Sequence, residues 1–185
     1  MNFEKSRKII LQELNESLNK VGEKESREFL DRLLESRRIF VVGEGRSRLM
    51  LQSFAKRLRH LGKESYVVGE TVTPAIGKGG LLVAASGSGK TSSVINIVKW
   101  AGRYKADVVF ITASPSPSLK KLADLTVTIP GAFSSRSSTK PASRQLMASL
   151  FEQTLLLFCD SVCLVLKDRL KVSETKMREN HANLE

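Results

Sequence analysis

Hydrophobic positions along the chain gather into short apolar runs that are separated by longer stretches with helical spacing. The runs are rich in Val, Ile, Leu and Ala, and their length and composition are typical of strands buried on both faces. They occupy residues 39–42, 66–68, 81–85, 108–111 and 125–129. Strands that alternate with helices predict a parallel sheet covered on both faces. The pattern therefore predicts an α/β three-layer sandwich with a sheet of five parallel strands. For this sheet we take the flavodoxin-like order 2-1-3-4-5.

The stretches between the runs place apolar side chains on one helical face and polar side chains on the other. Helices are predicted over residues 3–20 and 25–36, after 43–47, after 86–91, over 119–123, over 144–170 and from Ser173. No linker or internal repeat divides the chain. We therefore expect a single domain over residues 1–185, with N-terminal helices over 1–36, a sheet core over 39–130, and C-terminal helices and a tail over 144–185.

A Ser/Gly-rich loop follows the third predicted strand and precedes a helix. Its glycines allow close approach of the backbone, its hydroxyls donate hydrogen bonds, and the first N–H groups of the helix attract an anion. A simple strand-to-helix turn with a Ser or Thr cap is the alternative. The residues predicted to bind a phosphate are Ser86, Gly87, Ser88, Gly89, Lys90 and Thr91.

The same loop looks like the end of a Walker A motif, G-x-x-x-x-G-K-[ST]. The first glycine of that motif would fall at position 84, which is Ala84. A Walker B aspartate would end a later strand, whereas Asp107 precedes the strand over 108–111. These two departures disfavour a nucleotide-dependent phosphoryl transferase.

A second glycine-containing loop, Gly43-Glu-Gly-Arg-Ser47, follows the first predicted strand. A dinucleotide fingerprint would need a third glycine where Arg48 stands, so this loop is not one. Arg46 can give a charge-assisted hydrogen bond to an anion, and Ser47 adds a hydroxyl. In the order 2-1-3-4-5 the loops after the first and third strands flank the crevice where ligands bind. We therefore expect both loops in one site.

The composition and charge of the chain limit the kinds of molecule that it is expected to bind. Of 185 residues, 41% are hydrophobic and 26% are charged, and the net charge is +11. Lys and Arg are spread over all the predicted helices, so we expect a basic surface that attracts anionic metabolites and no nucleic acid partner. Cys159 and Cys163 share one helical face, and with only two histidines no structural zinc site and no other metal is predicted. The N-terminus lacks the apolar core of a signal peptide, and the longest apolar run, 155–166, is too short to span a membrane, so we predict a cytoplasmic protein with no membrane partner.

Several motifs together resemble the sugar isomerase (SIS) domain and, within it, the 6-phospho-3-hexuloisomerases. The resemblance runs nearly from end to end, although Lys90 stands where that family usually has an acidic residue and Glu44 where it usually has a small one. The shared motifs are GEGRS at 43–47, YVVGETVTPAIGKG at 66–79, SGSGKT at 86–91, LADLTVTIPG at 122–131, SLFEQ at 149–153 and HANLE at 181–185.

This resemblance implies that D-arabino-hex-3-ulose 6-phosphate is converted to D-fructose 6-phosphate without a cofactor. It also implies a homotetramer whose sites lie near subunit contacts. Moving the carbonyl from carbon 3 to carbon 2 through an enediol needs a base, and Glu152 is the candidate. Its place between Phe151 and the apolar run from Leu155 predicts partial burial. On the residues alone, it is equally well interpreted as an exposed helix carboxylate with no catalytic role. A non-catalytic sugar-phosphate sensor with the same pocket is the alternative function.

His181 is the second candidate catalytic residue. A histidine so near the end of the chain is usually part of a frayed tail, but HANLE is among the motifs that separate this family from other SIS domains. Imidazole can move protons between oxygens near neutral pH. We expect His181 to reach the active site of a neighbouring subunit.

Overall fold

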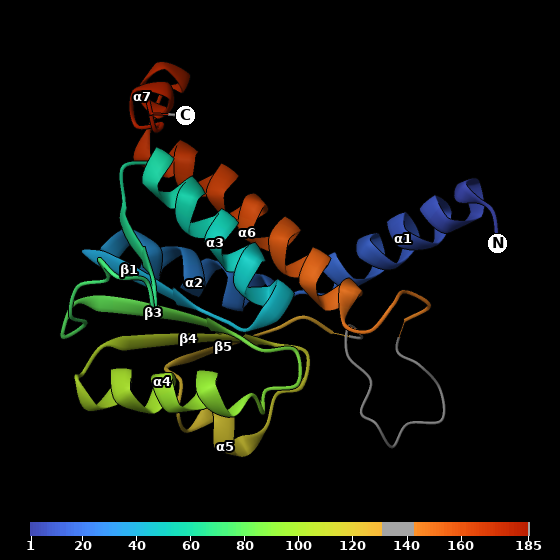
Figure 1. Ribbon diagram of the computed structural model, residues 1–185, viewed down its shortest axis with the longest axis horizontal. Helices are drawn as coiled ribbons and strands as arrows, with labels where there is room; N and C mark the ends of the chain where they lie inside the picture. The colour runs from blue at the N-terminus through green and yellow to red at the C-terminus, as the bar shows by residue number, and fades with distance from the viewer. Residues whose placement is uncertain (131–142, 185) are drawn as a thin grey trace.

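The computed structural model describes residues 1–130 and 143–184, and in this part of the chain five parallel strands form one sheet with helices on both faces (Figure 1). The strands are β1 (Arg38–Val42), β2 (Glu64–Val67), β3 (Gly80–Ala85), β4 (Asp107–Thr112) and β5 (Leu125–Thr128). The helices are α1 (Phe3–Leu18), α2 (Glu23–Glu35), α3 (Gly45–His60), α4 (Ser92–Arg103), α5 (Pro117–Lys120), α6 (Ser149–Leu170) and α7 (Glu174–Glu179).

The strand order is β2-β1-β3-β4-β5, and every neighbouring pair is parallel. The predicted fold class and strand order are confirmed. The order reverses between β1 and β3, where Val42 lies opposite Ala84 in register. The chain leaves both strands at the same edge of the sheet, which brings the loops that follow β1 and β3 together.

Successive residues of each strand face opposite sides of the sheet, so each strand contributes to two cores. In β1, Ile39 and Val41 join the core that includes residues of α2, α3 and α6, whereas Phe40 and Val42 join the core beneath α4 and α5. All four of these side chains are buried. Burial on both faces explains why the strands read as continuous apolar runs in the sequence.

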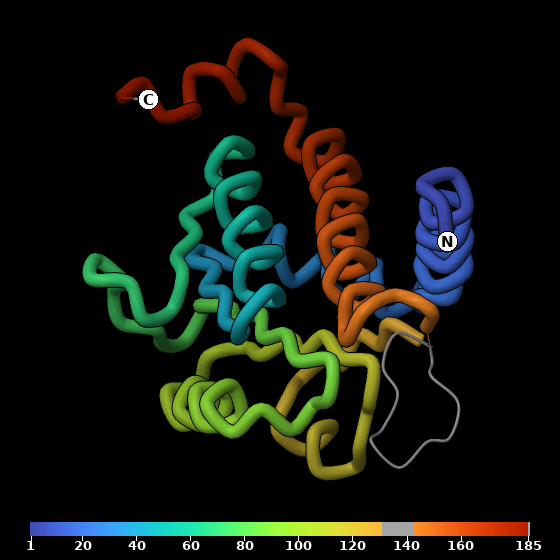
Figure 2. Tube along the Cα trace, turned by 45° about the vertical axis from the view of Figure 1, so that its right-hand side comes forward, coloured from blue at the N-terminus to red at the C-terminus, as the bar shows by residue number. Residues whose placement is uncertain are grey.

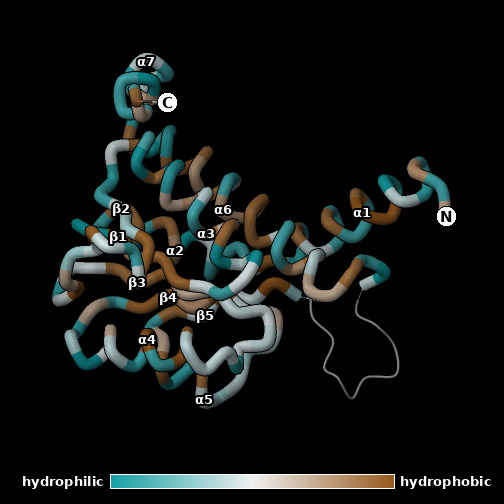
Figure 3. Tube along the Cα trace, viewed as in Figure 1, coloured by the Kyte–Doolittle hydropathy of each residue, from teal (hydrophilic) through white to brown (hydrophobic). Residues whose placement is uncertain are grey.

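Helices α4 and α5 cover one face of the sheet, and α2 and α3 cover the other, with α6 packed against α3 (Figure 2). Hydrophobic segments gather in the sheet and on the helix surfaces that face it, while polar segments lie outside (Figure 3). Helix α1 extends outward from this helical layer and carries the N-terminus at its outer end (Figure 1). Its contact with the rest of the fold is made mainly through α6.

The predicted helix over 144–170 begins later, at Ser149. Residues 143–148 form a non-helical connection in which Met147 has a φ of 52°. Since this stretch contains no glycine or proline, its sequence gave no signal of a break. The short helix predicted over 119–123 instead covers Pro117–Lys120, because the Ser116 side chain accepts a hydrogen bond from the Leu119 N–H and caps the helix there. Residues 131–142 lie outside the described residues. They include Gly131, which was predicted to follow the end of the fifth strand, and most of the Ser-rich loop that was predicted over 134–143.

Helix α6 is 22 residues long and apolar enough to cross a membrane by length and composition alone. It is a core helix here, since side chains along its whole length, from Phe151 to Leu166, are buried. Cys159 and Cys163 are buried on this helix as the sequence predicted, and burial raises the pKa of Cys163 to about 12. Both cysteines therefore serve packing.

Candidate active site at the carboxyl edge of the sheet

The loop after β3 is fastened to the end of β4 by backbone hydrogen bonds. The Ser86 N–H donates to the Ile111 carbonyl at 3.1 Å, and the Ala113 N–H donates to the Gly87 carbonyl at 3.2 Å. The buried Thr112 hydroxyl also donates to the Gly87 carbonyl at 3.3 Å. A loop that is held at several points keeps its donors in one arrangement, which lowers the entropic cost of binding an anion.

Gly89 is required by the shape of this loop. Its φ is +64°, and a Cβ atom there would lie 2.8 Å from Leu119 Cδ1 and 2.9 Å from the Ser114 carbonyl oxygen. A side chain at this position would therefore combine backbone strain with overlap against neighbouring atoms.

The hydroxyls of the loop point toward one another. Ser86 Oγ lies 2.8 Å from Thr91 Oγ1 and 3.4 Å from Ser88 Oγ. Thr91 is the N-cap residue of α4 but makes no side-chain cap hydrogen bond, because its hydroxyl is directed at Ser86. The N–H groups of the first turn of α4 have no partner within the helix itself. Hydroxyls and helix amides thus converge as a phosphate site would require.

Replacing any one of Ser86, Ser88 and Thr91 by alanine should chiefly raise KM for a sugar phosphate. A hydrogen bond to a charged group contributes about 1.5–3 kcal/mol, which corresponds to roughly 10-fold or more in KM. Steady-state kinetics will test this, with Ser53→Ala as the control because Ser53 is an exposed serine in the middle of α3. Unchanged KM in all three variants would show that this loop does not hold the phosphate.

The first turns of α3 and α6 meet at the same edge of the sheet. The Arg46 guanidinium donates a hydrogen bond to Ser149 Oγ at 2.8 Å and lies 3.1 Å from Glu152 Oε2. Glu152 is 13% exposed, so the predicted partial burial is confirmed, whereas Arg46 is 54% exposed. Ser47, in the first turn of α3, is buried. A largely buried carboxylate beside a cation that reaches solvent can accept a proton from a bound molecule.

A cavity of about 460 Å³ opens beside Arg46 and Ser149, between α1, the segment before α6 and the start of α6. It combines an apolar wall with polar and cationic side chains. Its lining includes Ile9, Ile10, Leu146, Arg46, Arg144 and Gln153. Of the residues that line this cavity, the sequence analysis predicted Arg46 as a binding residue. It did not predict Ser149 or the residues of α1.

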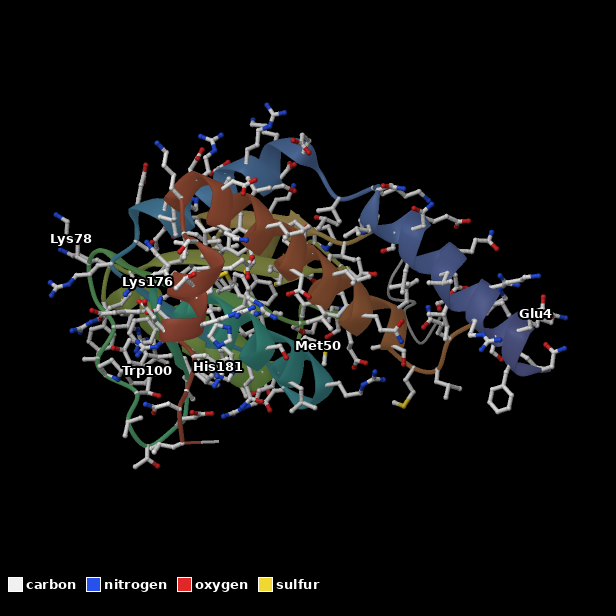
Figure 4. The ribbon with its side chains drawn as sticks, turned by 90° about the horizontal axis from the view of Figure 1, so that it is seen from above. Glu4, Met50, Lys78, Trp100, Lys176 and His181 are labelled. Carbon is white, nitrogen blue, oxygen red and sulfur yellow. The ribbon has the colours of Figure 1, made fainter. Side chains whose placement is uncertain are left out.

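His181 lies elsewhere in its own chain. Its ring stacks on that of His60, at the end of α3, with the ring centroids 4.9 Å apart. Arg46 is at the other end of α3, and the 1.5 Å rise per residue places that end about 21 Å from His60. Figure 4 shows His181 and Glu4 of α1 on opposite sides of Met50, which belongs to the first half of α3. One chain therefore does not bring His181 to Glu152.

Comparison with known proteins identifies the class to which this fold and site belong. Residues 32–156 match the SIS domain, and the chain belongs to the SIS-domain family. It is 41% identical to the 3-hexulose-6-phosphate isomerase of Bacillus subtilis, over 95% of each chain. It is 37% identical to the 3-hexulose-6-phosphate isomerase of Mycobacterium gastri, over 96% of this chain and 88% of the relative.

A solved structure agrees with these relatives. A Methanococcus jannaschii protein, for which the crystal structure infers a molecular function of 3-hexulose-6-phosphate isomerase, superposes with a TM-score of 0.83 at 31% identity, covering 98% of this chain and 99% of that one. The resemblance to the 6-phospho-3-hexuloisomerases that was drawn from the sequence motifs is confirmed.

Proposed function

We propose that this protein is a sugar-phosphate isomerase that converts D-arabino-hex-3-ulose 6-phosphate to D-fructose 6-phosphate through an enediol, without a cofactor. We further propose that it works in the cytoplasm as a homotetramer with its sites near subunit contacts. The observation that carries the proposal is the placement of two features at the same edge of the sheet. These features are the hydroxyl-rich loop 86–91 and the buried carboxylate of Glu152 beside Arg46. The relatives named as 3-hexulose-6-phosphate isomerases support the choice of substrate.

In this mechanism the phosphate is held by the loop 86–91 and the first amides of α4, and Lys90 adds a positive charge. The Glu152 carboxylate removes the proton from carbon 2 while the carbonyl at carbon 3 becomes a hydroxyl. The resulting enediol regains a proton at carbon 3, and the oxygen at carbon 2 becomes the carbonyl. One carboxylate can perform both transfers because the two carbons are adjacent. Arg46, which contacts Glu152, is placed to bind a sugar oxygen.

The proton that moves between the two oxygens needs its own carrier, and we assign this step to His181 of a neighbouring subunit. His181 stacks on His60, at the end of α3 that is remote from Arg46 and Glu152. This position favours a role for His181 in the site of a neighbouring subunit over a role in the site of its own chain. The exposed His181 ring on a C-terminal tail is accessible to such a neighbour.

The position of Asp107 argues against phosphoryl transfer. It begins β4, so it lies at the amino edge of the sheet, opposite the loop 86–91, and it is ion-paired with Arg32. A magnesium-binding aspartate would have to end the strand beside the phosphate loop. The structure thus agrees with the sequence in offering no Walker B aspartate on β4.

Nuclear magnetic resonance with fructose 6-phosphate labelled with ¹³C at carbon 3 tests the proposed function. The isomerase should convert carbon 3 from an alcohol to a ketone carbonyl carbon, and no added ATP or metal should be needed. A parallel thermal-shift series should show stabilisation by fructose 6-phosphate that exceeds the effect of inorganic phosphate, and no gain with ATP and magnesium. Stabilisation by the sugar phosphate without conversion would support the sensor and overturn the isomerase.

A further inference from the structure

Glu13 ties the outlying helix α1 to the chain that leads into α6. Its carboxylate accepts hydrogen bonds from Ser143 Oγ at 2.6 Å, from the Arg144 N–H at 2.8 Å and from Gln145 Nε2 at 3.2 Å. The Arg144 guanidinium adds an ion pair at 3.6 Å. Glu13 is only 13% exposed. One side chain therefore holds three consecutive residues that lie about 130 positions away in the sequence.

The carboxylate is held in its charged form. Burial opposes ionisation of Glu13, but the hydrogen bonds from Ser143, the Arg144 N–H and Gln145, together with the Arg144 charge, outweigh burial and leave its pKa below the ordinary value. Hydrogen bonds to a charged group are stronger than those between neutral groups. The contact is thus a strong polar link between α1 and the segment before α6.

Helix α1 also holds the chain on the other side of the β5–α6 connection. The Ser17 hydroxyl, one turn after Glu13, donates to the Pro130 carbonyl at 3.2 Å, and Ser17 is buried. Two successive turns of α1 therefore fix the backbone where it leaves β5 and where it approaches α6. Packing of one helix against another does not by itself require hydrogen bonds to the chain on both sides of the connection.

The held segment runs directly into the candidate base. After Gln145, the Ser149 N–H donates to the Leu146 carbonyl at 3.0 Å, and Met147 between them has a φ of 52°. A residue other than glycine persists in this backbone region only where the surrounding structure imposes it. The turn then delivers Ser149, which accepts the hydrogen bond from Arg46, and Glu152 one turn further along.

We propose that Glu13 is a positioning residue for the isomerisation, which fixes the first turn of α6, and with it Ser149 and Glu152, through its hold on residues 143–145. The inference rests on the proposed function, in which Glu152 is the base. A base displaced by a fraction of an ångström transfers protons poorly. The hydrogen bonds and the ion pair of Glu13 go to residues 143–145 and not to the loop 86–91. The effect of losing Glu13 should therefore fall on kcat.

Glu13→Ala should lower kcat about 10-fold or more and change KM less than about 2-fold, because a misplaced catalytic group affects the reaction and not the phosphate. Glu16→Ala is the matched control, since Glu16 is an exposed glutamate on the same helix. It should behave as wild type. Glu13→Gln retains an acceptor oxygen and should recover part of the kcat lost in Glu13→Ala.

A double variant separates positioning from general damage. In a Glu152→Gln background the added Glu13→Ala change should lower kcat no further. In a Ser86→Ala background the loss of kcat from Glu13→Ala and the rise in KM from Ser86→Ala should be independent, so that their effects on kcat/KM multiply. Circular dichroism and urea unfolding will verify that each variant is folded. Should Glu13→Ala fail to fold, Ser143→Ala, which removes one of the three hydrogen bonds, should still give a smaller loss in kcat at unchanged KM.

Two results would overturn the inference. One is a kcat for Glu13→Ala equal to that of Glu16→Ala, and the other is a full further loss of kcat on top of Glu152→Gln. Absence of conversion by the wild-type protein would instead overturn the proposed function. The two failures are thus distinguishable.

Discussion

Glu152→Gln is expected to lower kcat for the isomerisation about 100-fold or more while leaving KM nearly unchanged. The amide cannot take up the carbon-bound proton, so the step that general-base catalysis accelerates is lost. In the proposed mechanism the phosphate is held by separate groups in the loop 86–91, so ground-state binding should be retained. Glutamine has nearly the same shape, and its amide oxygen can take the place of the carboxylate oxygen that lies beside Arg46. The free energy of unfolding should therefore change little.

The measurement is the rate of conversion of labelled fructose 6-phosphate, together with a binding isotherm for the same compound. Glu35→Gln is a suitable control, because Glu35 is an exposed carboxylate at the end of α2. Its kcat should equal that of the wild type. If Glu152→Gln retains a normal kcat, the base is another residue and the proton-transfer scheme must be redrawn.

A mixture of Glu152→Gln and His181→Ala subunits is expected to regain activity that neither variant has alone. If each site takes its base from one subunit and its histidine from a neighbour, random mixing at equal amounts gives both wild-type residues to about a quarter of the sites. Activity should approach that fraction of the wild-type value. The physical basis is the separation within one chain, where His181 stacks on His60 at the end of α3 remote from Arg46.

The mixture must be prepared by unfolding and refolding the two variants together, with each variant refolded alone as the control. Size-exclusion chromatography and native mass spectrometry, with a mass tag on one variant, will show whether mixed oligomers form. Deletion of residues 181–185 should lower kcat without unfolding the protein. A mixed oligomer that stays as inactive as its parents would mean that His181 does not act across a subunit contact.

Local patterns in the sequence were enough to predict the α/β fold class and one half of the candidate site. Apolar runs such as 81–85 and 108–111 record burial on both faces, and the amphipathic stretches between them record one-sided burial, so local periodicity was enough to define strands and helices. The order β2-β1-β3-β4-β5 then placed the loops 43–47 and 86–91 at one edge. The proposed phosphate site lies on a single strand–loop–helix unit, and all its candidate donors are therefore close together in the sequence.

The other half of the candidate site depends on contacts between distant segments, which the sequence did not predict. Arg46 meets Ser149 and Glu152 across about a hundred residues, and no local pattern encodes which face of α6 turns toward α3. The connection before α6 likewise depends on a distant residue, because Glu13 on α1 accepts hydrogen bonds from residues 143–145. This connection has a positive φ at Met147 although it contains no glycine. Periodicity reports how each segment is buried, whereas the pairing of charged and polar groups depends on which segments pack together.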